Sequence, residues 1–231
     1  MHEIQEKWRS IADNIYTLSY QFSNMGLQVS TRMTVVKLSD GSLLSHSAVP
    51  LTPTQKQQLD SMGPLRHIVA PSAMHHLFVG DLAAQYPKAR IYGTKGVRRK
   101  RPDLMTMELL PTIEAEPWAG DLEYLRFGGI PMLDETVWFH PASGSLIATD
   151  ILQCWKGPLS LPVRLYLGLT GGHERLTVPR SVRLLVKDKA AVKASAAQMQ
   201  QWPVQRVILL HNSVIEDKAS LRLAEALSVW N

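Results

Sequence analysis

One stretch decides how the rest of the chain is interpreted: Leu65-Arg66-His67-Ile68-Val69-Ala70-Pro71-Ser72-Ala73-Met74-His75-His76. Its first six residues are rich in Leu, Ile and Val, which is typical of a short buried strand. Pro71 and Ser72 favour an irregular turn, and two adjacent histidines follow that turn. The stretch therefore combines a rigid strand with two potential metal ligands just beyond its end.

Two later segments have the same layout, an apolar run followed by a ligand-type side chain. Asp150 follows the run from Ser145 to Thr149, and His211 follows the run from Val207 to Leu210. Strand ends in α/β folds can aim such side chains at one point. The pattern predicts one divalent metal ion bound by His75, His76, Asp150 and His211. Imidazole and carboxylate ligands suit Zn²⁺, Fe²⁺ or Mn²⁺, and zinc is the first expectation for a histidine-rich set.

The histidine pair also has a simpler interpretation, as two surface residues at the start of a helix. Consecutive residues of a regular helix point about 100° apart. Both side chains can therefore bind one ion only if the turn before the helix directs His75 inward.

Length and composition set the limits for the other expectations. The chain has 231 residues, of which 45% are hydrophobic, and we expect a single domain over residues 1–231. No stretch of about 18 uninterrupted apolar residues occurs, so neither a transmembrane helix nor a membrane partner is expected. Cys154 is the only cysteine, which excludes an internal disulfide and a cysteine-based zinc cluster. The polar residues 1–6 lack the layout of a signal peptide, and a cytoplasmic location is the default expectation.

The net charge of +5 is moderate and permits a nucleic-acid or phosphorylated partner without requiring one. Much of it lies in the basic run Lys95-Gly96-Val97-Arg98-Arg99-Lys100-Arg101. A solvated loop is the first interpretation of this run, and a patch that contacts phosphate groups is the second.

Hydrophobic periodicity and turn residues predict an alternation of strands and helices. Strands are expected at residues 14–18, 32–38, 42–47, 65–70, 89–92, 122–127, 136–140, 146–149 and 205–210. Helices are expected from Thr52 to Gly63 and at residues 74–86, 179–201 and 216–230. Hairpin turns are expected at Asp40-Gly41 and at residues 142–145. Residues 151–178 are expected to form an ordered loop that can include one short helix.

Both halves of this order begin with antiparallel strands and end with βα units. Two mixed sheets packed face to face, with helices on the outside, satisfy the order. The expected fold class is therefore α/β, a four-layer αββα sandwich.

At this level the chain resembles the metallo-β-lactamase fold, and in particular its divergent DUF4336 branch. The main signature of that fold, T-H-x-H-x-D-H, aligns with Ala70 to His76. Pro71 and Ala73 then stand at the positions of two first-site histidines, whereas His75 and His76 stand at the second-site Asp and His.

The other signatures of the fold show the same difference between first-site ligands, which are absent, and second-site positions, which hold ligand-type residues. The segment that supplies a third first-site histidine corresponds to residues 127–132, which contain no histidine. Asp150 and His211 match the later Asp and His signatures, and Ser45 or His46 stands at the usual strand-end Asp of the N-terminal half. The resemblance thus implies a site reduced to one metal ion, and two-metal hydrolysis of the usual kind is not expected.

Further side chains are candidates for supporting the ligands or lining a substrate pocket: His46, Glu135, His173 and Arg180. For the pair Asp134-Glu135 a solvated turn is the first interpretation, and an approach of Glu135 to the metal is the alternative. His67 is expected to be a hydrogen-bonded structural histidine, and Cys154 a buried apolar residue.

The leading functional hypothesis is a metal-dependent hydrolase that acts on a small ester, lactone, amide or phosphoester, with Asp150 also in proton transfer. One alternative is a regulatory, non-catalytic domain whose closed four-ligand metal is structural. Another is a nucleic-acid phosphodiesterase, for which the basic run at 95–101 is the local support.

Overall fold

The computed structural model describes residues 7–24, 27–110, 116–157, 159 and 161–230. The chain divides into two compact units. Unit 1 comprises residues 1–22 and 30–118, and unit 2 comprises residues 23–29 and 119–231. Residues 1–6, on which the expectation of no signal peptide rests, lie outside the described part of the chain. Within that part, no helix combines the length and the apolar character needed to cross a membrane.

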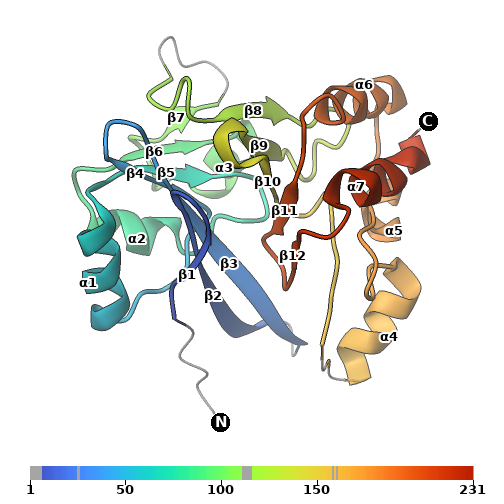
Figure 1. Ribbon diagram of the computed structural model, residues 1–231, viewed down its shortest axis with the longest axis horizontal. Helices are drawn as coiled ribbons and strands as arrows, with labels where there is room; N and C mark the ends of the chain where they lie inside the picture. Colours follow the sequence, from blue (N-terminus) through green and yellow to red (C-terminus); the bar gives the residue numbers. More distant parts are fainter. Residues whose placement is uncertain (1–6, 25–26, 111–115, 158, 160, 231) are drawn as a thin grey trace. The chain divides into compact units, whose positions relative to one another are not determined.

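The sheet of unit 1 has seven strands that lie in chain order (Figure 1). Strands β1 and β2 pair antiparallel, as do β3 and β4, whereas β4 to β7 pair parallel. The strands are β1 (Arg9–Ala12), β2 (Ile15–Asn24), β3 (Leu27–Lys37), β4 (Leu43–His46), β5 (Leu65–Ala70), β6 (Arg90–Gly93) and β7 (Glu108–Leu109). The predicted hairpin turn at Asp40-Gly41 is confirmed, since the Ser42 amide donates to the Asp40 carboxylate and Gly41 has a φ of 82°.

Three helices accompany this sheet: α1 (Pro53–Met62), α2 (Val79–Gln85) and α3 (Lys95–Lys100). The start of α1 is as predicted, because Thr52 and Gln55 form a reciprocal capping box. The buried apolar residues of these helices pack in one core with residues of the strands; they are Leu59, Val79, Leu82 and Val97.

Two expectations for unit 1 are wrong. The helix expected from residue 74 begins only at Val79, because residues 73–78 form turns. The basic run is helical over Lys95–Lys100 and not a loop, because the Thr94 hydroxyl accepts from the Val97 amide and caps the helix.

The sheet of unit 2 has five strands in the order β12-β11-β10-β9-β8. Strands β10 and β11 pair parallel and the other neighbours pair antiparallel. The strands are β8 (Glu123–Arg126), β9 (Thr136–His140), β10 (Ser145–Ala148), β11 (Arg206–Leu209) and β12 (Val214–Ile215). The predicted turn between β9 and β10 is present as the short helix η1 (Pro141–Ser143), which Gly144 ends in the left-handed conformation.

The helices of unit 2 are α4 (Leu161–Thr170), α5 (Arg180–Leu184), α6 (Lys189–Met199), α7 (Ala219–Leu227) and η2 (Ser228–Trp230). The single helix expected over residues 179–201 is wrong. It is broken between α5 and α6, where the Lys187 amide donates to the Gly129 carbonyl and the Asp188 side chain caps α6. The apolar sides of α6 and α7 pack in one core with the strands of this sheet.

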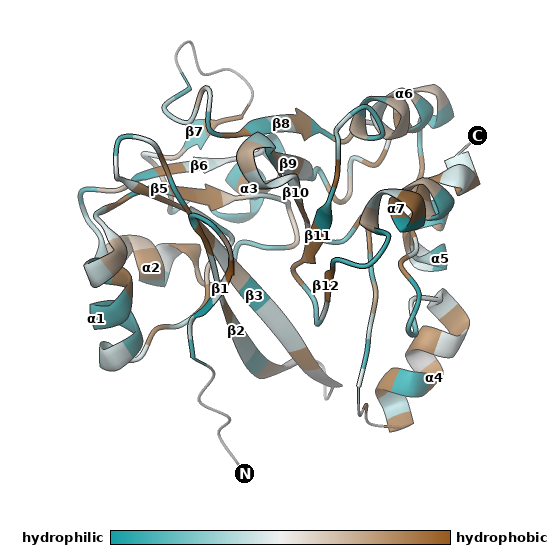
Figure 2. Cartoon of the chain, in the orientation of Figure 1, coloured by the Kyte–Doolittle hydropathy of each residue, from teal (hydrophilic) through white to brown (hydrophobic). Residues whose placement is uncertain are grey.

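Each unit thus contains a mixed sheet with helices packed on it, and the predicted α/β fold class with two mixed sheets is confirmed. Figure 2 shows hydrophobic residues concentrated on the strands of both sheets. The parallel pairs, β4 with β5 and β10 with β11, are the parts of each sheet that position the candidate ligands.

Candidate functional site

In unit 2, the parallel pair β10–β11 brings Asp150 and His211 together. Ala148 and Leu209 are partners in the register, and the Leu210 amide donates to the Ala148 carbonyl. Asp150 lies two residues after the end of β10, and His211 lies two residues after the end of β11. The Nε2 atom of His211 lies 3.5 Å from Oδ1 of Asp150, and both side chains are largely shielded from solvent.

Glu135 fixes the loop that carries Asp150. Its carboxylate accepts hydrogen bonds from the amides of Thr149, Asp150 and Ile151, at 2.7, 3.0 and 2.9 Å. Glu135 is 1% exposed, and burial raises the pKa of its carboxyl, as does the charge of nearby Asp150. The interpretation of Asp134-Glu135 as a solvated turn is therefore wrong.

His211 is held by an aromatic neighbour and a tight turn. The ring of Trp155 stacks on the ring of His211, with centroids 5.8 Å apart and planes at 13°. Asn212, with a φ of 62°, forms the turn after His211, and its side chain makes two hydrogen bonds to the backbone of Lys156. The segment around residue 155 is thereby tied to the turn after β11.

In unit 1, His75 and His76 lie in the turn between β5 and α2. The His75 amide donates to the Ser72 carbonyl, and the Ser72 hydroxyl accepts from the Met74 amide. Both histidines are half-buried. Because neither belongs to a helix, the 100° separation of helical neighbours does not apply to them.

Lys100 and Arg101, at the end of the basic run, each donate a hydrogen bond to a carbonyl of this turn. The Nζ atom of Lys100 donates to the Ala73 carbonyl at 2.7 Å, and Nη1 of Arg101 donates to the His76 carbonyl at 2.8 Å. Arg101 also lies over Gly80 of α2, where a Cβ atom would meet Nη2 at 2.5 Å. A third member of the run, Arg98, donates to the carbonyl of Met107. Much of the basic run is therefore engaged in holding backbone.

His46 and His76 both have lowered pKa values. Burial and the charge of His75 lower the pKa of His46, which ends β4, to about 3. Burial and the charges of Lys100 and Arg101 lower the pKa of His76. Both imidazoles are therefore neutral at neutral pH, which is the form that binds metals.

The remaining candidates are His173 and Arg180 of unit 2 and His67 of unit 1. The side chain of His173 is exposed, and its backbone forms an isolated β-bridge with Trp155. Arg180 begins α5, and its guanidinium donates to the Leu169 carbonyl at 3.3 Å. His67 is buried beside Tyr92, as expected of a structural histidine.

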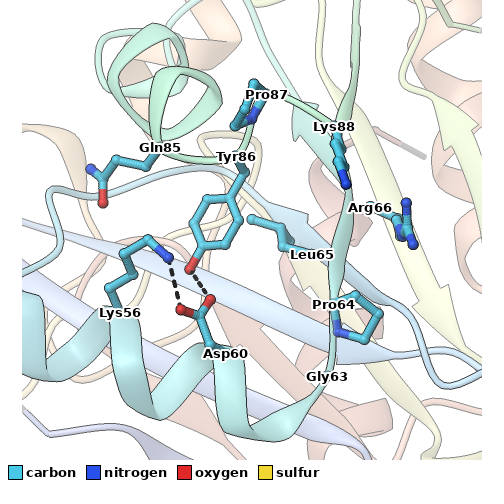
Figure 3. A pocket seen from close by; sticks show the side chains of 10 residues that line it. All are labelled: Lys56, Asp60, Gly63, Pro64, Leu65, Arg66, Gln85, Tyr86, Pro87 and Lys88. Atoms are coloured by element: carbon cyan, nitrogen blue, oxygen red, sulfur yellow. Dashed lines mark hydrogen bonds and ion pairs between the residues drawn. The ribbon is translucent and has the colours of Figure 1, made fainter.

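Unit 1 also has a pocket of about 610 Å³ at the start of β5. Its lining includes Leu65 and Tyr86, and Figure 3 shows Asp60 accepting from the Tyr86 hydroxyl and from Lys56. The turn with His75 follows the other end of β5, so this pocket is separate from the candidate ligand.

The family model described as "Domain of unknown function (DUF4336)" matches residues 12–156, which is more than half of the chain. The chain belongs to the DUF4336 family. No curated protein matches it.

Solved structures show which fold this DUF4336 chain has. A metallo-beta-lactamase from Pontibacter korlensis is 13% identical, with 96% of this chain and 99% of that chain covered and a TM-score of 0.64. One from Erythrobacter litoralis is 14% identical, with 99% of each chain covered and a TM-score of 0.65. One from Hirschia baltica is 12% identical, with 96% and 97% covered and a TM-score of 0.62. The DUF4336 chain thus has the metallo-β-lactamase fold, as its sequence predicts.

The separation of Asp150 and His211 in the DUF4336 chain fits two ligands of one metal ion. Ligand atoms at about 2.0–2.2 Å from a tetrahedral ion lie about 3.3–3.6 Å apart, and the Asp150–His211 separation of 3.5 Å agrees with this. A charge-assisted hydrogen bond is shorter, at about 2.7–2.9 Å. Pro71 and Ala73, at the positions where the resemblance implies an absence of first-site histidines, are both buried.

Sequence reasoning missed two supporting residues, Lys100 and Arg101. It named Glu135 as a candidate for supporting the ligands, but it did not show the hydrogen bonds by which Glu135 holds the Asp150 loop. Lys100 and Arg101 were part of a basic run, and their contacts with a turn more than twenty residues earlier leave no pattern in the sequence.

Proposed function

We propose that this DUF4336 protein is a metal-dependent hydrolase that binds one divalent metal ion through His75, Asp150 and His211. The observation that carries the proposal is the Asp150–His211 pair, whose 3.5 Å separation suits two ligands of one ion. Each of the three residues offers a ligand atom of a suitable type and is partly exposed. The proposal requires both units to contribute to one site, as the metallo-β-lactamase resemblance implies.

We assign His75 rather than His76 to the metal on electrostatic grounds. Burial lowers the pKa of His76, and so do the positive charges of Lys100 and Arg101, which would also repel a divalent cation. Three protein ligands leave one position of a tetrahedral ion open, as in catalytic zinc sites. The four-ligand set expected from the sequence would leave none.

The chemistry divides between the ion and the chain. A bound divalent cation polarises a carbonyl or phosphoryl oxygen and makes water a better nucleophile. Glu135 holds the loop that carries Asp150. One carboxylate oxygen of Asp150 would ligate the ion, and the other would accept a proton from the water. Trp155 fixes the ring plane of His211. These roles suit hydrolysis of a small ester, lactone, amide or phosphoester.

The nucleic-acid alternative has less local support than the basic run suggested. Arg98, Lys100 and Arg101 each bind a backbone carbonyl within unit 1. Most of the cations of that run are therefore committed to holding the protein's own backbone rather than available to phosphate groups.

A substrate panel tests the proposal. Metal-stripped protein is reloaded with Zn²⁺, Mn²⁺ or Fe²⁺ and assayed against a p-nitrophenyl ester, an acyl lactone, a dipeptide amide and a bis-p-nitrophenyl phosphodiester. We expect turnover of at least one class that needs metal and falls by about 100-fold or more in Asp150→Asn. The control Glu174→Gln, at an exposed site of the same unit, should keep full activity. Stoichiometric metal with no metal-dependent turnover of any class would favour the structural-metal alternative instead.

A further inference from the structure

Helix α4 of unit 2 exposes a row of leucines. Leu161, Leu165 and Leu169 are 66%, 63% and 75% exposed, and their spacing of four places them on one side of the helix. Their side of the helix is here termed the leucine face. Hydrophobic bands are visible along α4 in Figure 2. Single exposed leucines are normal on protein surfaces, but three in line form an apolar patch of the kind that contacts a partner.

The leucine face is not the side that α4 buries. Val163 and Leu167, on the opposite side, are buried in a small cluster with Trp155. The apolar character of the helix therefore exceeds what its own packing requires. Leu184 on the following helix, α5, is also exposed, at 85%. The two helices are neighbours, since Arg180 of α5 donates to the Leu169 carbonyl.

The surrounding segment is strongly basic. Residues 156–187 contain six cations and one acid, Glu174. The six cations are Lys156, Arg164, Arg175, Arg180, Arg183 and Lys187. Five of them are exposed, and Arg183 is half-buried. Exposed leucines on one side of a helix, in a segment rich in cations, are the pattern of helices that lie in the surface of an anionic bilayer.

We propose that the leucine face docks α4 on the surface of an anionic lipid membrane, with the helix axis in the membrane plane. The leucines would enter the boundary between headgroups and acyl chains, and exposed cations of the segment would contact anionic headgroups, with Arg164 of α4 itself among them. A helix of ten residues is far too short to span a bilayer. Binding is through the surface alone and is therefore reversible.

Charge complementarity favours this occupant over a second copy of the chain. Two leucine faces in a symmetric dimer would bring two sets of these cations near each other, which costs binding energy. An anionic membrane turns the same cations into an attraction. The proposal is independent of the hydrolase proposal, and its test requires no activity.

Vesicle co-sedimentation tests the proposal with the full chain. Vesicles of phosphatidylcholine with about 30% phosphatidylglycerol are compared with pure phosphatidylcholine vesicles. We expect binding to the anionic vesicles at least about tenfold tighter than to the neutral ones, and weaker binding as salt is raised. The variant Leu161→Gln/Leu165→Gln/Leu169→Gln should bind about tenfold or more weakly. Leu221→Gln, at a 56% exposed leucine of α7, is the matched control and should bind like the unaltered protein.

Circular dichroism verifies that the triple variant is folded. If it is not, Arg164→Glu, which reverses one charge on α4 and leaves the leucines in place, is used and should weaken binding to anionic vesicles. Equal binding by the variant and the unaltered protein would overturn the proposal, as would equal binding to both kinds of vesicle. A concentration-dependent dimer in light scattering, lost in the triple variant, would assign the leucine face to a second copy and overturn it as well.

Discussion

At the scale of single residues, the site depends on side chains that hold the candidate ligands as much as on the ligands themselves. Glu135 satisfies three amides of the loop that carries Asp150, and Trp155 stacks on His211. Partners of this kind orient metal ligands and tune their affinity. The sequence identifies Asp150 and His211 because each follows an apolar strand. Glu135 gains its role through contacts with residues 149–151, which no local pattern encodes.

Glu135→Gln tests the anchoring role directly. Glutamine keeps one acceptor oxygen but presents an amide group toward at least one backbone N–H, so a buried donor loses its partner. We expect the free energy of unfolding to fall by about 1–3 kcal/mol and zinc affinity to fall by about 10-fold or more. Urea denaturation and competitive zinc titration measure the two effects. The control Glu174→Gln should change neither, and unaltered zinc affinity in Glu135→Gln would contradict the anchoring role.

His46 should make the metal-free protein sensitive to acid. Its pKa falls from 6.5 to about 3 in the folded chain, so between these values the unfolded chain binds more protons than the folded chain. The free energy of unfolding therefore falls as the pH falls through this window. From pH 7 to pH 5 we expect a loss of about 2 kcal/mol that His46→Asn lacks. Urea unfolding in EDTA at both pH values measures it. The same loss in His46→Asn would show that other groups cause it, and His173→Asn, an exposed control, should retain it.

At the scale of elements, α3 is a helix that braces a turn of another part of unit 1. Lys100 and Arg101 hold the carbonyls of Ala73 and His76. We expect Lys100→Ala and Arg101→Ala each to weaken zinc affinity by about 10-fold, because the His75 turn loses its orientation. Lys95→Ala, at the exposed start of the same helix, should have no effect. Equal zinc affinity in all three variants would show that the turn is fixed by other contacts.

Substitutions at two glycines of unit 2, Gly129 and Gly120, distinguish the effect of close packing from that of backbone strain. Gly129 has a φ of 82°, and a Cβ atom there would lie 2.3 Å from the Asp188 carbonyl oxygen, whereas Gly120 has a φ of 90° and open space around it. Gly120→Ala should therefore cost about 1 kcal/mol of stability through strain alone. Gly129→Ala should cost about 2 kcal/mol more, because the start of α6 must shift. Thermal unfolding measures both, and equal losses would contradict the close approach of Gly129 to α6.

The elements that the sequence predicts well are those that local chemistry determines. The Thr52 capping box and the Asp40-Gly41 turn act within a few residues. The errors arise where distant contacts decide. The expected helix over residues 179–201 breaks because the Gly129 carbonyl takes the Lys187 amide. The short helix that the sequence allows within residues 151–178 is α4, and the glycines and prolines of that segment leave its position undetermined from sequence alone.

At the scale of the whole molecule, the fold persists at 12–14% identity to the metallo-beta-lactamases described above. Such persistence is expected because the order of strands and helices and their apolar patterns determine the fold, and many sequences satisfy them. The candidate ligands at the ends of β10 and β11 follow from that order. Whether the chain hydrolyses a substrate depends on the site and not on the fold.

Metal analysis of the purified protein tests the central claim most directly. Under metal-replete conditions we expect about one zinc or other divalent ion per chain by mass spectrometry. His75→Ala and His211→Ala should each lose most of it, whereas His76→Ala and the exposed control His173→Ala should retain it. Two ions per chain, no ion, or full occupancy in both His75→Ala and His211→Ala would contradict the account.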